Sequence, residues 1–135
     1  MAIENQGWGG RWLFLLAGLS GASAVGLGAY ISHALTLSEP LAGYVALALQ
    51  YHFYHTLALL GCALLTLFIH QERGYRLSYC AATCFLAGIF LFCGSFYYWA
   101  LTGQKLLGWL TPVGGMCFIL GWLCLAMIAL RGNKQ

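Results

Sequence analysis

Apolar residues fill four long stretches of the chain, and the Lys, Arg, Asp and Glu residues all lie between or beyond them. The stretches cover residues 12–31, 41–69, 77–101 and 112–130. Each is long enough for an α-helix to cross a bilayer, which takes about 20 apolar residues. None alternates between apolar and polar residues as the strands of a membrane β-barrel do. The pattern predicts an all-α protein, a four-helix transmembrane bundle with short connections that forms one integral membrane domain over residues 1–135.

The composition supports a membrane environment and argues against nucleic acid as a partner. Hydrophobic residues make up 61% of the chain and charged residues 7%, whereas soluble domains are about 25% charged. The net charge of +3 is too small and too scattered for nucleic-acid binding. We therefore expect the lipid bilayer as the surroundings, with other membrane proteins or further copies of the chain as candidate partners.

The basic residues predict how the chain is oriented in the membrane. With four spans, both termini lie on the same side as the connection between the second and third spans. Five basic residues fall on that side and one on the other, and such an excess marks the cytoplasmic side. Both termini are therefore predicted to be cytoplasmic. The five are Arg11, Arg73, Arg76, Arg131 and Lys134, and the sixth is Lys105.

Small residues recur at helical spacing in the first and last stretches. Three of them follow one another at intervals of four residues in the first stretch, and the last stretch has a similar stripe. Small residues let membrane helices approach closely and pack by van der Waals contact. The positions predicted to serve helix packing are Gly18, Ala22, Gly26, Gly28, Gly94, Gly114, Gly115 and Gly121.

The six cysteines are also interpreted as small residues that serve helix packing. They lie within the apolar stretches, where free cysteines behave as small hydrophobic packing residues and where disulfides are not expected. No Cys-x-x-Cys pair is present, so the usual signature of a structural zinc site is missing.

Two histidines, His52 and His55, lie in the middle of the second stretch. Polar side chains at that depth are costly and usually face protein or a water-filled cavity. At three-residue spacing, the two rings are predicted to share one face of a helix. The candidate site is a polar intramembrane cluster, for which we select Gln50, Tyr51, His52, Tyr54, His55, His33 and Ser95.

Three roles remain open for these histidines. They can tie helices together, with His55 neutral and bonded to a nearby residue or to a backbone carbonyl near residues 18–22; they can carry protons or touch a ligand; or they can bind a metal or haem. The third role is disfavoured because no acidic or thiolate third ligand is clearly placed. In addition, His33 and His70 lie near opposite membrane surfaces, so neither can face His52. We expect no metal and no cofactor.

The sequence assigns no catalytic residue. Glu4, Glu39 and Glu72 all lie outside the four stretches, whereas proton-driven pumps commonly rely on a carboxylate inside the membrane. The chain also lacks a nucleophile elbow, a phosphate-cradling loop and a paired-carboxylate motif.

Several short motifs together resemble one family. They read Gly28-Ala29-Tyr30-Ile31-Ser32-His33, Gln50-Tyr51-His52-Phe53-Tyr54-His55-Thr56-Leu57-Ala58-Leu59, Cys93-Gly94-Ser95-Phe96-Tyr97, Leu101-Thr102-Gly103, Thr111-Pro112-Val113-Gly114-Gly115 and Gly121-Trp122. In this order they resemble the YgdD-like small four-span bacterial membrane proteins, domain-of-unknown-function family 423. The chain departs from the family pattern at Ile31, Ser32 and Cys93. The resemblance implies a multi-pass protein of the bacterial inner membrane, and it implies no reaction. It also shifts the emphasis from the histidine pair to His55, because His52 occupies a position that the pattern leaves open.

We expect an accessory, assembly or envelope-integrity protein without catalytic activity of its own. The alternative is a small carrier or channel, oligomeric, that moves a solute or proton along a path lined by His, Gln and Tyr. A third possibility is an enzyme acting on lipid, which needs a groove open to the bilayer beside a titratable pair. A wet cavity reaching Gln50 and His55 would favour the carrier, and a dry bundle with one exposed small or aromatic face would favour the accessory role.

Overall fold

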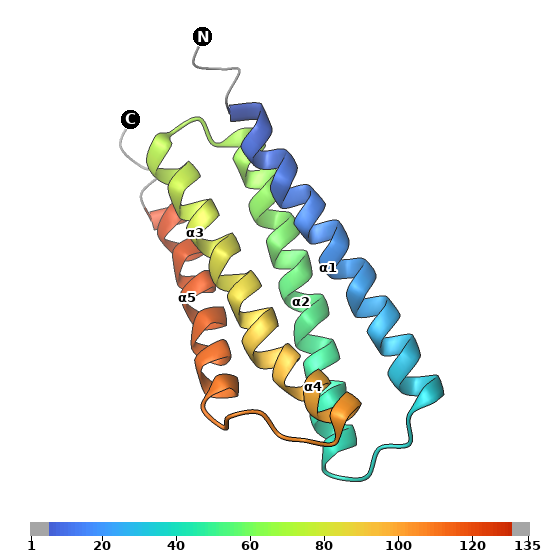
Figure 1. Ribbon diagram of the computed structural model, residues 1–135. Coiled ribbons are helices and arrows are strands. Elements are labelled where there is room, and N and C mark those ends of the chain that lie inside the picture. Colours follow the sequence, from blue (N-terminus) through green and yellow to red (C-terminus); the bar gives the residue numbers. More distant parts are fainter. Residues whose placement is uncertain (1–5, 131–135) are drawn as a thin grey trace.

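The computed structural model describes residues 6–130, and these residues are almost entirely helical (Figure 1). The elements are α1 (Gln6–Ala34), α2 (Leu41–Phe68), α3 (Glu72–Gly88), a π-helical segment η1 (Ile89–Cys93), α4 (Gly94–Thr102) and α5 (Leu110–Leu130). Because α3, η1 and α4 follow one another without a break, they form one long rod. Four helices in this part of the chain are long and apolar enough to cross a membrane, which confirms the predicted all-α, four-span architecture.

The third spanning helix begins earlier than its apolar stretch predicted. It runs over Glu72–Thr102 rather than 77–101, because its first turn consists of charged and polar residues. The exposed side chains of Glu72 and Arg76 form an ion pair of 3.1 Å across that turn, and such pairs support a helix by a few tenths of a kcal/mol, about 0.2–0.5. An apolar pattern therefore predicts the membrane-embedded length of a helix but not its end.

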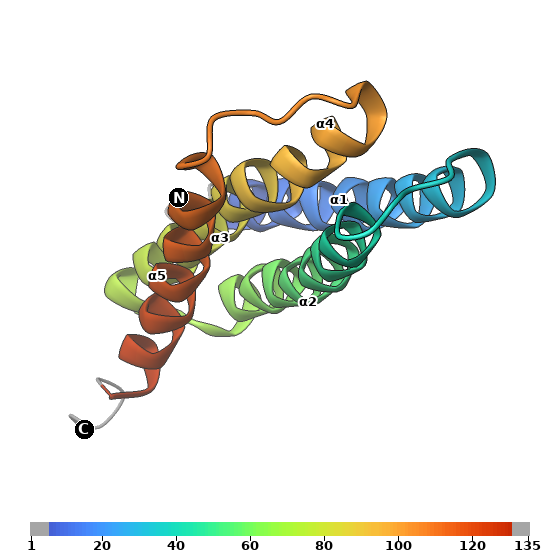
Figure 2. The same ribbon diagram turned by 90° about the horizontal axis from the view of Figure 1, so that it is seen from below.

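The helices are arranged in the order α1, α2, α3, α5 across the molecule (Figure 1). The closest contacts between spans join α1 to α2, α2 to α3, and α3 to α5, while η1 and α4 also pack on α2. The view turned by 90° shows α1 and the C-terminal part of α5 pointing in different directions (Figure 2). As a result, α2 and α5 are neighbours of α3 that do not pack closely on one another.

Glycines of α5 allow this helix to lie close to α3 and η1. A β-carbon at Gly121 would overlap the ring of Phe85, and a β-carbon at Gly114 would overlap the backbone of Phe92. Both glycines are buried. Since small residues allow this close approach, two of the positions that the sequence assigns to packing lie where α5 meets α3 and η1.

Small residues line two faces of α1, and the bundle covers only one of them. Gly18, Ala22 and Gly26 are exposed, and an added β-carbon at either glycine would meet no atom of another residue within 4 Å. Instead α1 turns the buried Ala17 and Ala24 toward the bundle, and a β-carbon added at Gly28 would touch Leu49 of α2. Spacing alone does not say which of two small faces is used, so packing through Gly18, Ala22 and Gly26 requires a second molecule and stays a prediction.

Candidate functional site

A polar network joins three helices at the middle of α2. The ring of His52, which is only 3% exposed, has its Nε2 atom 3.1 Å from the hydroxyl of Ser20 on α1. Its Nδ1 atom lies 3.1 Å from the hydroxyl of Tyr97 on α4. Ser20 is also 2.6 Å from the hydroxyl of Thr56, one turn along α2 from His52. These contacts satisfy both ring nitrogens and connect α1, α2 and α4.

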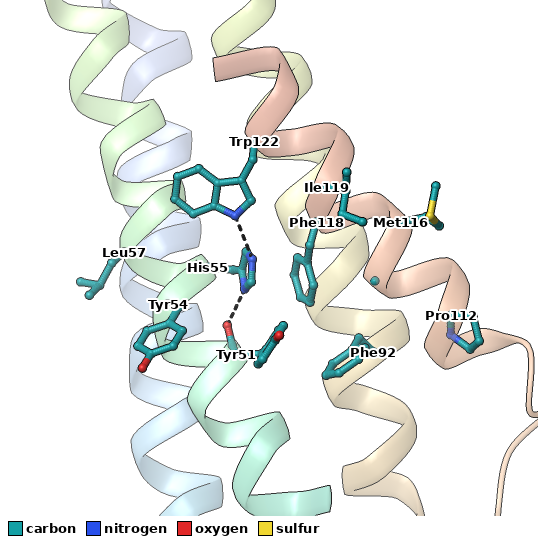
Figure 3. Close-up of a pocket in the computed structure, with 11 residues that line it drawn as sticks. Tyr51, Tyr54, His55, Leu57, Phe92, Pro112, Met116, Phe118, Ile119 and Trp122 are labelled. Atoms are coloured by element: carbon teal, nitrogen blue, oxygen red, sulfur yellow. Dashed lines mark hydrogen bonds between the residues drawn. The ribbon is translucent and has the colours of Figure 1, made fainter. Parts of the chain in front are cut away.

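His55 faces a different neighbour, α5 (Figure 3). Its Nδ1 atom is 2.7 Å from the backbone carbonyl of Tyr51, and the indole N–H of Trp122 donates to its Nε2 atom over 3.2 Å. A carbonyl can only accept and an indole N–H can only donate. The hydrogen therefore belongs on Nδ1 and the lone pair on Nε2, so these contacts select a neutral ring in one tautomer.

Aromatic contacts hold the His55 ring in place. It stacks on Phe118 with the ring centroids 3.6 Å apart and an interplanar angle of 14°, and it is 5% exposed. Tyr51 in turn stacks on Phe92 of η1 at 5.1 Å. The predicted neutral, hydrogen-bonded state of His55 agrees with this geometry.

Both histidines are buried on α2, but they meet different helices. Residues three apart on an α-helix differ by about 60° in direction, which is enough here for His52 to meet α1 and His55 to meet α5. The partner expected for His55 on α1, a carbonyl near residues 18–22, is not the one found, because its nitrogens contact Tyr51 and Trp122. The α1 residue in that range, Ser20, uses its hydroxyl and bonds His52 instead.

The other residues of the predicted cluster lie in separate places. Gln50 donates to the hydroxyl of Tyr54 over 2.8 Å on the exposed side of α2, and Tyr54 is 54% exposed. Ser95 bonds Thr111 at the start of α5 over 2.8 Å. His33 is exposed in the last turn of α1, thirteen residues and roughly 20 Å along the helix from Ser20. The structure therefore does not assemble one cluster from the seven residues.

Several residues of the histidine networks are absent from the predicted cluster. Four contact a histidine, namely Ser20, Tyr97, Phe118 and Trp122, and Thr56 bonds Ser20. Thr56 has a recognisable signal, because it follows His52 by four residues on the same helix face. The others come from different helices, and no spacing along the chain connects them to α2.

A groove lies between α2 and α5 beside His55 (Figure 3). Its volume is about 800 Å³, within the range of about 300–1,000 Å³ that is usual for ligand sites. Most of the lining is apolar, and Phe92 of the π-helical segment contributes to the wall. The lining residues are Tyr51, Tyr54, His55, Leu57, Phe92, Pro112, Gly115, Met116, Phe118, Ile119 and Trp122.

The thiols and acidic groups offer no metal site in residues 6–130, where no three His, Cys, Asp or Glu side chains are close enough to hold an ion. All six cysteines are free. The closest contact between them joins Cys124 and Cys80, whose sulfur atoms are 3.5 Å apart at the α3–α5 interface.

Four apolar helices, buried polar side chains that bond one another, and a lateral groove define a multi-pass integral membrane protein. Residues 27–115 match the family described as "Protein of unknown function (DUF423)". The UPF0382 inner membrane protein YgdD of Escherichia coli K12 is 36% identical over 128 residues, which cover 93% of this chain and 94% of the relative. The chain belongs to this family, DUF423 or UPF0382, which confirms the resemblance seen in its motifs.

Further relatives extend the similarity to other bacteria. The UPF0382 membrane protein of Haemophilus influenzae is 37% identical over 118 residues, 86% of this chain and 90% of the relative. The UPF0382 membrane protein YwdK of Bacillus subtilis is 34% identical over 120 residues, 87% of this chain and 94% of the relative. No solved structure matches the chain. The names of the relatives and the four spanning helices agree on a multi-pass protein of the inner membrane.

Proposed function

We propose that the protein is a non-catalytic accessory protein of the inner membrane, and that it supports the assembly of other membrane components or the integrity of the envelope. In this proposal its working surface is the groove between α2 and α5. The observation that carries the proposal is an apolar, aromatic-lined groove that opens on the side of a membrane bundle. Such a groove can receive a hydrophobic component from within the bilayer.

The bonding of the histidines supports a docking role over a chemical one. A general base needs a ring nitrogen that can reach the proton it removes from a substrate. Both nitrogens of His55 are engaged, by Tyr51 and by Trp122, and so are both nitrogens of His52. Within residues 6–130, no buried side-chain nitrogen or oxygen lacks a hydrogen-bond partner.

The proposed orientation has both termini in the cytoplasm. Arg73 and Arg76 follow α2 at one end of the bundle, and Lys105 follows α4 at the other; Arg131 and Lys134 of the predicted asymmetry lie outside the described residues. An excess of basic residues marks the cytoplasmic side. Reporter fusions after Gln135 and within residues 103–108 should therefore report opposite compartments. A periplasmic signal from the Gln135 fusion would overturn the orientation.

The groove can be tested with a matched pair of glycine variants. A side chain added at Gly115 enters the open space of the groove, and one added at Gly26 enters open space on α1. The measurement is the envelope integrity of cells that lack the wild-type protein and carry one of the two variants. Gly115→Phe should fail to restore this integrity, whereas Gly26→Phe should restore it. Equal activity of the two variants, at equal membrane abundance, would show that the groove is not the working surface.

A second candidate function is the transfer of protons across the bundle. The observation in its favour is the hydrogen-bonded chain from Ser20 through His52 to Tyr97, in which each group can pass a proton to the next. In vesicles that contain a pH-sensitive dye, the wild-type protein would then dissipate a proton gradient and His52→Leu would not. Identical traces with and without the protein would exclude this role.

A further inference from the structure

The groove matches one leaflet of a bilayer in length. Along α5 its lining runs from Pro112 to Trp122, which is ten residues and roughly 15 Å of helix. This is half of the hydrocarbon core, which is about 30 Å thick. Pro112 lies near the start of α5, at the membrane surface, and Trp122 lies near the middle of the helix. The groove therefore follows the path of one lipid chain from the surface to the midplane.

The walls of the groove suit hydrocarbon. Leu57, Met116 and Ile119 supply flexible aliphatic side chains, and Phe92 and Phe118 supply rings. The two nitrogens of His55 are already bonded, to Tyr51 and Trp122. A polar ligand would lose its hydration in such a lining for few partners, whereas an acyl chain loses nothing.

A series of aromatic contacts connects the groove to a cation at the membrane surface. Phe92 contacts Phe96 with ring centroids 5.5 Å apart, and Phe96 stacks on Tyr44 at 5.3 Å. Tyr44 lies 6.1 Å from Trp99, and the ammonium of Lys105 lies 4.3 Å from the centre of the Trp99 ring. Lys105 belongs to the connection that leads into α5, so its positive charge lies at the same end of the bundle as Pro112 of the groove.

We propose that the groove binds one acyl chain of an anionic phospholipid, whose phosphate lies near Lys105. The lipid comes from the leaflet at the α4–α5 end of the molecule. This inference rests on the proposed function and names the hydrophobic component that the groove receives. One basic residue near an anionic lipid is worth about 1 kcal/mol, so the preference over a zwitterionic lipid is about fivefold.

Photo-crosslinking of the full-length protein in lipid vesicles tests the proposal. The probes are phosphatidylglycerol and phosphatidylcholine, each with a diazirine in the middle of one acyl chain, at equal low mole fraction in phosphatidylcholine vesicles. The phosphatidylglycerol probe should label the peptide containing Met116 and Trp122 about fivefold more than the phosphatidylcholine probe does. Equal labelling of that peptide by the two probes would overturn the proposal.

Filling the groove should remove the specific labelling. In Gly115→Phe, the phosphatidylglycerol probe should label this peptide no more than the phosphatidylcholine probe does. Gly26→Phe changes a glycine that faces open space on α1, and this variant should keep the stronger labelling by phosphatidylglycerol. If Gly115→Phe does not fold, Met116→Trp fills the same groove from an exposed position. Persistence of the excess in a folded groove-filling variant would place the lipid elsewhere and contradict the inference.

The role of the Lys105 charge in lipid preference is tested with a second matched pair of variants. Lys105 and Glu39 both lie in connections at the same end of the bundle. Lys105→Gln should make the labelling by the two probes equal, and Glu39→Gln should keep the preference for phosphatidylglycerol. A preference that survives Lys105→Gln would refute the assigned phosphate position.

The outcomes also separate this inference from the proposed function. If the lipid labels the groove as expected but Gly115→Phe restores the envelope phenotype fully, the proposed function fails and lipid binding stands. If Gly115→Phe loses the phenotype but the wild-type groove is not labelled selectively, the lipid inference fails. Disuccinimidyl crosslinking would then show whether a second copy or another protein covers the groove.

Discussion

The two histidines of α2 lie three residues apart, but one is enclosed between helices and the other borders an open groove. His52 is enclosed between helices, where hydroxyls of Ser20 and Tyr97 bond its two nitrogens. His55 lies at the floor of a groove, held by one backbone carbonyl and by the indole of Trp122, whose side chain is half exposed. The same residue type therefore has two uses on α2. His52 joins helices, and His55 forms part of the wall of an open groove.

The largest effect on stability is expected at the enclosed histidine. His52→Leu removes the partner of the Tyr97 hydroxyl, which is buried, and an unsatisfied buried group costs about 1–3 kcal/mol. Ser20 keeps its bond to Thr56. Thermal unfolding in mild detergent should show His52→Leu melting well below both the wild type and His55→Leu. If His55→Leu melts lower, the contrast between the two environments is wrong.

The bond between His52 and Tyr97 can be isolated in a double-mutant cycle. Tyr97→Phe should cost about 0.6 kcal/mol and at most about 1.7, the range found for hydrogen bonds between membrane helices. Combined with His52→Leu it should add little further, because the shared bond is already lost. Fully additive losses of unfolding free energy would indicate that the two groups do not interact.

At the groove, the expected effect is smaller and local. His55→Leu removes the acceptor of the Trp122 indole N–H, but this side chain borders the open groove and can reorient. His55→Gln offers an amide oxygen and should be milder still. Comparing unfolding free energies with envelope function distinguishes the roles. Loss of function in His55→Leu at unchanged stability would make this histidine functional rather than structural.

The tautomer of His55 gives a prediction without any mutation. The hydrogen belongs on Nδ1, because Tyr51 presents a carbonyl there and Trp122 presents a donor to Nε2. Nitrogen NMR of protein labelled at histidine should show a neutral His55 ring protonated at Nδ1. A neutral ring protonated at Nε2 would mean that the contact with Trp122 does not form.

The smallest effect is expected from the cysteines. All six are free, and the most enclosed, Cys62 and Cys93, are surrounded by apolar residues of the core. Replacing all six by Ala should leave a folded protein with a modestly lower melting temperature. Loss of a stoichiometric bound metal upon replacement would contradict the packing role.

The sequence by itself determined the membrane-spanning helices and the family. Long apolar stretches report the thickness of the hydrocarbon core directly, and a chain of motifs over nearly its whole length carries the resemblance that the relatives confirm. It also placed two histidines in the middle of the second span. The neutral, bonded state of His55 stays a prediction, which its contacts with Tyr51 and Trp122 favour. All these properties depend on distances along one chain or one helix.

Only the tertiary structure decided which groups meet. Helical spacing placed His52 and His55 on one broad face, but an angle of about 60° between them sends one to α1 and the other to α5. Gly18 and Gly114 looked alike as small residues, yet one is exposed and the other is buried against Phe92. The groove exists because α5 lies close to α3 along its length but meets α2 mainly through side chains, such as Phe118 against His55. Such choices depend on how whole helix surfaces fit together, and no local pattern in the sequence encodes that fit.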